Sequence, residues 1–127
     1  MAGLLFSVGE YDNHVKVYNN LYVNGQTTSN GFFDNSDARL KTLTNKSVDA
    51  SSIKGLSYIW NDEKDSLEHF GYLAQDVQKI MPWAVNEGKD GFLSVRYNEV
   101  FAVKIDNIED EIKELKSKIV QLEGRLN

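Results

Sequence analysis

A serine and a lysine five positions apart are the residues of this sequence best suited to chemistry. Ser36 and Lys41 open and close the hexapeptide SDARLK. A serine hydroxyl is a poor nucleophile at neutral pH, so it needs a base within hydrogen-bond reach. Lysine can be that base when burial, as at a subunit interface, favours its neutral amine. The pair predicts a lysine-activated nucleophile. The alternative is a helix start in which Ser36 is the N-cap, Asp37 lies in the first turn and Lys41 is a solvated charge.

The content of cysteine and histidine limits the other chemistries. Cysteine is absent, and His14 and His69 are the only histidines. The sequence therefore offers neither a disulfide framework nor a thiolate metal site, and we predict no metal and no cofactor. His69 is a second candidate base, or an ordinary surface or core-edge residue of a strand.

Composition narrows the class of protein. The 127 residues are 41% hydrophobic and 26% charged, which predicts one compact domain with an appendage. The net charge of −5 argues against a nucleic-acid partner, because phosphate binding uses clustered lysines and arginines. The sequence has no apolar run long enough for a membrane span, and residues 1–6 do not resemble a signal peptide. We expect a soluble chain without a membrane partner that is not exported by its own sequence.

The segments before the hexapeptide are short and strand-like. Residues 14–18 alternate in polarity, residues 21–23 continue the pattern, and Asn24-Gly25 is a strong hairpin dipeptide. An isolated hairpin is marginally stable in water, so we expect this region to pair with other copies or to belong to a longer fibre. Residues 29–36 indicate a linker into the next unit.

The segments after the hexapeptide predict an α+β unit. A short helix over 48–54 should end at Gly55 in the left-handed cap position. Strands at 56–60 and 69–73 form a first hairpin, and segments 83–85 and 92–95 form a second. Between the hairpins, the apolar spacing of residues 74–81 predicts a helix that Pro82 stops.

The C-terminal residues follow a strict heptad pattern. Apolar residues at alternating steps of four and three form one seam: Phe101, Ile105, Ile108, Ile112, Leu115, Ile119, Leu122 and Leu126. This period predicts a left-handed coiled coil. Parallel packing would pair opposite charges between neighbouring helices: Lys104 with Glu109, Glu111 with Lys116, and Lys118 with Glu123. The seam therefore favours parallel self-association over a single helix packed on its own domain, but its mixed Ile and Leu leave two or three strands open.

The order of these segments resembles a known family. The segments that carry the resemblance are the hexapeptide, Tyr58-Ile59-Trp60, GYLAQDVQ at 71–78, Met81-Pro82, Tyr97 and the heptads. Over roughly residues 20–127 they resemble the C-terminal intramolecular chaperone domain of phage tail spikes, tail fibres and neck appendages. This is the self-cleaving, peptidase S74 type found in endosialidase tailspikes. The resemblance implies three parts: a β-structured fibre stem with its linker at 1–35, a chaperone domain at 36–100 and a trimeric coiled-coil helix at 101–127.

The resemblance also implies a function. Ser36 and Lys41 would cut the bond between Asn35 and Ser36 in a single-turnover, self-cleaving serine/lysine endopeptidase reaction. Asp37 and Arg39 match the motif and would orient Lys41 or stabilise the oxyanion. The partners would be two further copies, giving a homotrimer, and the stem of the same polypeptide. The domain would act in the host cytoplasm during virion assembly and be released, while the fibre stays in the virion tail or appendage. The alternative is a permanent trimerisation tip that is not cleaved.

Overall fold

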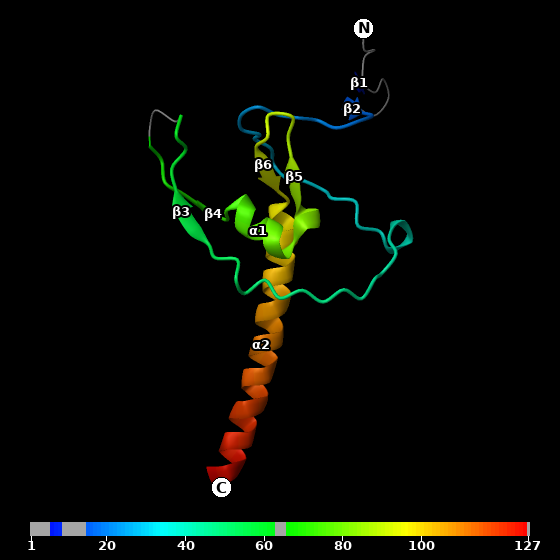
Figure 1. The fold of residues 1–127 in the computed structure, drawn as a ribbon. Helices are drawn as coiled ribbons and strands as arrows, with labels where there is room; N and C mark the ends of the chain where they lie inside the picture. Colours follow the sequence, from blue (N-terminus) through cyan, green and yellow to red (C-terminus); the bar gives the residue numbers. More distant parts are fainter. Residues whose placement is uncertain (1–5, 9–14, 63–65, 127) are drawn as a thin grey trace. The chain divides into compact units, whose positions relative to one another are not determined.

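The structure is a computed structural model that describes residues 6–8, 15–62 and 66–126. The chain divides into two compact units, residues 1–43 and residues 44–127. Figure 1 shows the elements of each unit, coloured along the sequence.

The first unit contains little regular structure. Strand β1 (Phe6–Val8) pairs antiparallel with β2 (Val15–Val17), with Phe6 opposite Val17. The next regular element is a single turn of 3₁₀ helix, η1 (Ala38–Leu40). Every residue from 15 to 43 is exposed, including the large apolar side chains of Tyr22, Phe33 and Leu43. These residues therefore build no hydrophobic core of their own.

Two predictions for this region are wrong. Residues 21–23 form no strand, and Asn24-Gly25 joins no hairpin, although Gly25 does adopt a positive φ of 140°. The physical reason is that residues 26–37, which would have to supply the return strand, are not in a strand. The hairpin instead lies earlier, where β2 pairs with β1. Residue 14 of the predicted strand lies outside the described residues.

The second unit has the predicted α+β composition of small sheets and a long C-terminal helix. Strands β3 and β4 form one antiparallel pair, and β5 and β6 form another. The elements follow in the order β3 (Leu56–Tyr58), β4 (His69–Gly71), α1 (Ala74–Ile80), the 3₁₀ turn η2 (Pro82–Ala84), β5 (Val85–Glu87), β6 (Leu93–Val95) and α2 (Tyr97–Leu126). Both predicted hairpins are present, but with other bounds: residues 83 and 84 lie in η2 rather than in a strand, and residues 59–60 and 72–73 lie outside β3 and β4. The helices predicted at 74–81 and toward the C-terminus are confirmed.

Local chemistry explains where these elements end. The amide of Met81 donates to Val77 O at 2.7 Å and closes α1, and Pro82 cannot continue the helix because it lacks an N–H. In the β5–β6 turn, Gly91 has a φ of 85°, a conformation that favours glycine. Helix α2 begins at Tyr97, four residues before the first predicted seam residue, and at 30 residues is roughly 45 Å long.

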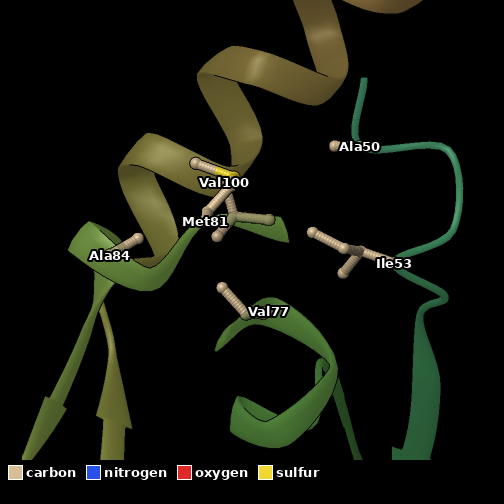
Figure 2. Packing of buried hydrophobic residues seen from close by; sticks show 6 residues of the cluster. All are labelled: Ala50, Ile53, Val77, Met81, Ala84 and Val100. Carbon is tan, nitrogen blue, oxygen red and sulfur yellow. The ribbon is translucent and has the colours of Figure 1, made fainter. Parts of the chain in front are cut away.

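The core of this unit lies where α1, η2 and the start of α2 meet the loop before β3. Figure 2 shows the side chains that are fully or almost fully buried there: Ala50, Ile53, Val77, Met81, Ala84 and Val100. Ala50 and Ile53 come from the loop, so this irregular segment contributes to the core as the helices do. In Figure 1 the C-terminal half of α2 extends beyond α1 and both hairpins.

The predicted helix over 48–54 is wrong. These residues form an irregular loop with one turn, in which the Ile53 amide donates to Ala50 O at 3.1 Å. Side chains of α2 form hydrogen bonds with backbone groups of this loop that a helix would have paired internally. Gly55 is also not a left-handed cap, because its φ is not positive. A Cβ at position 55 would lie 2.6 Å from the Phe70 ring, so the exposed ring would have to shift to accept any other residue there.

Candidate functional site

The first unit brings Ser36 and Lys41 together. Lys41 Nζ donates a hydrogen bond to Ser36 Oγ at 2.7 Å. Five residues of extended chain would span roughly 17 Å, so the chain between them must turn back. The pair has the contact that a serine nucleophile and its base require.

The η1 turn produces this contact. Asp37 is its N-cap, and its carboxylate accepts from the Arg39 amide at 2.8 Å. Backbone bonds from Leu40 N to Asp37 O (3.0 Å) and from Lys41 N to Ala38 O (3.2 Å) complete the turn. The residue before the cap and the residue after the turn are therefore placed side by side, and these are Ser36 and Lys41.

A second interaction reinforces the turn. The Arg39 guanidinium donates two hydrogen bonds to the Asp37 carboxylate, from Nε to Oδ1 at 3.0 Å and from Nη2 to Oδ2 at 2.8 Å. The side-chain bond from Arg39, followed by its backbone bond, lowers the pKa of Asp37 from its ordinary value, and the same pairing raises the pKa of Arg39. In the single chain, Asp37 and Arg39 thus hold the turn. Their predicted roles toward Lys41 or an oxyanion stay predictions.

The site is open to water. Asn35, Ser36 and Lys41 are exposed, as are the flanking apolar side chains of Leu40 (73%) and Leu43 (86%). A solvated site of this kind has the geometry of a nucleophile and base, but it lacks the dry environment that favours a neutral lysine.

His69 lies in β4 of the second unit. Its ring stacks on Tyr58 at 5.4 Å between centroids, and Trp60 lies beside both rings. These contacts place His69 in an aromatic cluster of the β3–β4 hairpin. Its role as a second base stays a prediction.

The eight seam residues all lie on one helix and are all exposed. Their exposed fractions run from 45% for Ile112 to 86% for Leu126. The second unit therefore folds without covering the seam, which leaves a continuous apolar stripe along α2. Such a stripe is what a partner helix would bury.

Two of the lysines predicted to pair between helices have partners within the chain. Lys118 lies 3.2 Å from Glu114, one turn away on α2. Lys104 is half-buried and donates to backbone carbonyls of the loop before β3. The proposed pairing between helices would therefore compete with these intrachain bonds.

Sequence reasoning missed several residues that position the second unit. Lys104 and Asn107 bond the loop 48–53, Lys46 Nζ lies 3.6 Å from the centroid of the Trp83 ring, and the Tyr97 hydroxyl bonds the backbone of Tyr72. All of these partners are separated by 25 or more positions, so no local pattern indicates them. The polar or aromatic character of each residue is the only signal that the sequence contains.

The described part of the chain, residues 6–8, 15–62 and 66–126, contains neither a cluster of metal ligands nor a membrane-spanning helix. Among those residues, no three side chains of His, Cys, Asp or Glu gather as a metal site would require. Of the helices described, none combines the length and the apolar character of a membrane span.

The fold and site together define a class: a small α+β domain preceded by a Ser–Lys pair and followed by a long helix with an unpaired apolar seam. The family model described as the chaperone of endosialidase, Peptidase_S74, matches residues 36–86. The matched segment begins at Ser36 and includes Lys41, both hairpin strands β3 and β4, α1 and η2. The predicted family resemblance is therefore confirmed, and the match supports an intramolecular chaperone role for this segment. A search of curated protein sequences gives no match.

Proposed function

We propose that this chain is an intramolecular chaperone that trimerises through α2, templates folding of a phage fibre, spike or neck appendage, and then cuts itself free between Asn35 and Ser36. The observation that carries the proposal is the 2.7 Å contact between Lys41 Nζ and Ser36 Oγ. The match of residues 36–86 to a chaperone family supports the folding role.

The chemistry proceeds in two steps. Lys41, as a neutral amine, takes the hydroxyl proton while Ser36 Oγ attacks the Asn35 carbonyl carbon. The C–N bond between Asn35 and Ser36 breaks, its nitrogen takes that proton, and an ester joins Asn35 to Ser36 Oγ. Water then hydrolyses the ester, which leaves a carboxylate on Asn35 and a free hydroxyl and amine on Ser36. The second fragment is residues 36–127.

Assembly supplies the trigger. In the contact described, Lys41 Nζ is the donor and Ser36 Oγ the acceptor, so the direction of this bond must reverse before the amine can take the hydroxyl proton. Leu40 and Leu43 flank Lys41 and are exposed, with large apolar surfaces that a folded trimer would cover. Covering them also removes water from Lys41, and desolvation favours the neutral amine. Cleavage then reports that assembly is complete.

The seam supplies the alignment. Eight exposed apolar residues at heptad spacing support a parallel coil, and the family resemblance favours three strands over two. A β-structured stem folds through long-range pairings with exposed edges, so its chains benefit from alignment at one end. We place this event in the host cytoplasm during virion assembly, with the stem of the same polypeptide as the client.

The test is the intact mass of the purified chain and of three variants. The unmutated chain should yield a fragment of residues 36–127, whereas Ser36→Ala and Lys41→Ala should stay full length. Lys41→Arg is the sharpest control, because arginine keeps the charge and the donors but cannot be deprotonated. It too should stay uncut. A stable trimer of uncut, unmutated chains would overturn the self-cleavage and leave a permanent trimerisation tip.

A further inference from the structure

Lys104 is a half-buried cation of α2 whose partners within the chain are carbonyls and one aromatic ring. Its Nζ donates to Ala50 O at 3.2 Å and to Ile53 O, and it lies 5.6 Å from the centroid of the Tyr72 ring. Within the described part of the chain it forms no ion pair with a carboxylate. An ammonium has three N–H donors, and the two carbonyls use two of them. One donor of Lys104 is therefore left for an acceptor from outside the chain.

The loop at residues 48–53 is held against the same side of α2. Asn107 Oδ1 accepts from the Ala50 amide at 2.9 Å, and Asn107 Nδ2 donates to Val48 O at 2.8 Å. The loop contains no helix or strand, so these bonds and those of Lys104 satisfy backbone groups that regular structure does not. They fix the loop next to the seam, because Lys104 and Asn107 each directly precede a seam residue.

A cavity of about 200 Å³ lies between this loop and the helix. Two loop residues and four residues of α2 line it: Ala50, Ser51, Lys104, Asn107, Ile108 and Glu111. Ile108 is a seam residue and is 52% exposed in the single chain. The cavity therefore adjoins the apolar stripe that a second helix would cover in the proposed assembly.

The heptad register indicates which side chain of a second copy would reach this cavity. With the seam residues at a and d, Lys104 and Glu111 are g residues and Glu109 is an e residue. In a parallel coil a g residue faces the e residue of the next heptad on the neighbouring helix, so Lys104 faces Glu109 of a second copy. Glu111, the carboxylate that lines the cavity, faces Lys116 of that copy in the same way. Charges of opposite sign therefore meet along this side of the helix.

We propose that the Glu109 carboxylate of a second copy enters this cavity and accepts a hydrogen bond from the free donor of Lys104. The interface between copies then includes the loop at 48–53 as well as the seam. Lys104 bonds its own loop and the neighbouring helix at once. This inference rests on the proposed assembly through α2 and names the charged contact that fixes its parallel register.

The other end of the helix shows why this pair differs from an ordinary surface pair. Lys118, which would face Glu123 of a second copy, already lies 3.2 Å from Glu114 of its own chain, and its side chain is 62% exposed. A second carboxylate there competes for a solvated, paired cation and adds little. Lys104 is half-buried and lacks a carboxylate of its own, so a partner carboxylate gains more from reaching it.

The experiment is sedimentation equilibrium of the full-length chain in the Ser36→Ala background, so that only uncut chains are compared. Glu109→Gln should lower the association constant of the trimer by about tenfold or more, because three such pairs are lost at once. Glu123→Gln removes the same charge from the same heptad position and should lower it by less than about threefold. Glu109 is exposed in the single chain, so the circular dichroism of the monomer should stay unchanged.

A double variant separates the proposed pair from the role of Lys104 in the loop. In the Lys104→Met background, Glu109→Gln should no longer weaken the trimer, because the cation that it would bond is gone. If Lys104→Met does not fold, Glu109→Lys is compared with Glu123→Lys. The first places a like charge against Lys104 and should weaken the trimer more than the second does.

The outcomes distinguish failure of this contact from failure of the assembly. Equal losses at positions 109 and 123 in a chain that still forms trimers would overturn the contact alone. A full effect of Glu109→Gln without the Lys104 cation would overturn it as well. A Ser36→Ala chain that stays monomeric would overturn the proposed assembly through α2, and the contact with it.

Discussion

The two units of this chain differ in how much of a buried core each one forms. Residues 44–127 bury a core of six side chains and pair two hairpins, whereas residues 15–43 leave every side chain exposed. The pair suited to chemistry lies in the exposed unit, and the seam suited to assembly lies on the folded one. The folded unit thus has a core of its own in the single chain, whereas residues 15–43 of the exposed unit have none.

The largest expected effect comes from breaking the seam. Ile112→Asp places a charge at the centre of the stripe, where a coiled coil would bury it without a partner, so the trimer should be lost and cleavage should fall below detection. The circular dichroism of the second unit should be kept, because Ile112 is exposed in the single chain. The control Lys113→Asp introduces an aspartate one position away from the seam, and this variant should assemble normally. A monomer that still cuts itself would remove the link between assembly and chemistry.

The next effect compares buried with exposed apolar residues. Ile53→Ala should lower the free energy of unfolding by about 2–5 kcal/mol, because the side chain is fully buried in the core of the second unit. Leu40→Ala, in the exposed unit, should change the free energy of unfolding by less than about 0.5 kcal/mol. Both variants are compared in the monomeric Ile112→Asp background. Urea denaturation measures both. Equal losses would show that residues 15–43 also contribute to a core in the single chain.

A smaller effect tests the packing of the folded unit at Gly71. A Cβ there would meet the Tyr97 hydroxyl at 2.7 Å, and that hydroxyl bonds the backbone N and O of Tyr72. Gly71→Ala should therefore cost about 1–3 kcal/mol of stability. In the Tyr97→Phe background the added methyl group no longer meets an oxygen, so the cost of Gly71→Ala should fall. Additive costs in the double variant would contradict this packing.

The smallest effect concerns the turn that carries the chemistry. Because pairing with Arg39 lowers the pKa of Asp37, the turn is stabilised above the ordinary aspartate range and loses this stabilisation as the pH falls through the lowered value. The carboxyl carbon of Asp37, followed by NMR, should titrate below the free value of about 3.9. Arg39→Ala should return the midpoint toward that value. A midpoint unchanged by Arg39→Ala would show that the ion pair is absent in solution.

The elements that the sequence predicts correctly are those defined by neighbouring residues. Pro82 ends α1, strands β3 and β4 flank a charged turn, and the heptads mark α2, all from local patterns. The loop at 48–53 was missed because its backbone partners, Lys104 and Asn107, lie more than 50 positions away. The Asn24-Gly25 hairpin was wrong because a turn signal cannot supply the return strand.

In the candidate site too, one contact was predicted from the sequence and another was not. The spacing of Ser36 and Lys41 predicted the pair, and their 2.7 Å contact agrees with that chemistry. The sequence did not indicate that Asp37 and Arg39 would bond each other to form the turn, because it could not assign which of them would orient Lys41 and which would stabilise an oxyanion. Side-chain pairing within one turn depends on backbone geometry that the hexapeptide alone does not specify.

The most direct test of the account separates the freshly made, unmutated chain by size and then measures the intact mass in each fraction. If the Ser36–Lys41 pair acts only on assembly, the trimer fraction contains residues 36–127, beginning at Ser36, and the monomer fraction contains only uncut chain. Uncut chains throughout the trimer fraction, or the same fragment in the monomer fraction, would contradict the claim that the Ser36–Lys41 pair acts on assembly.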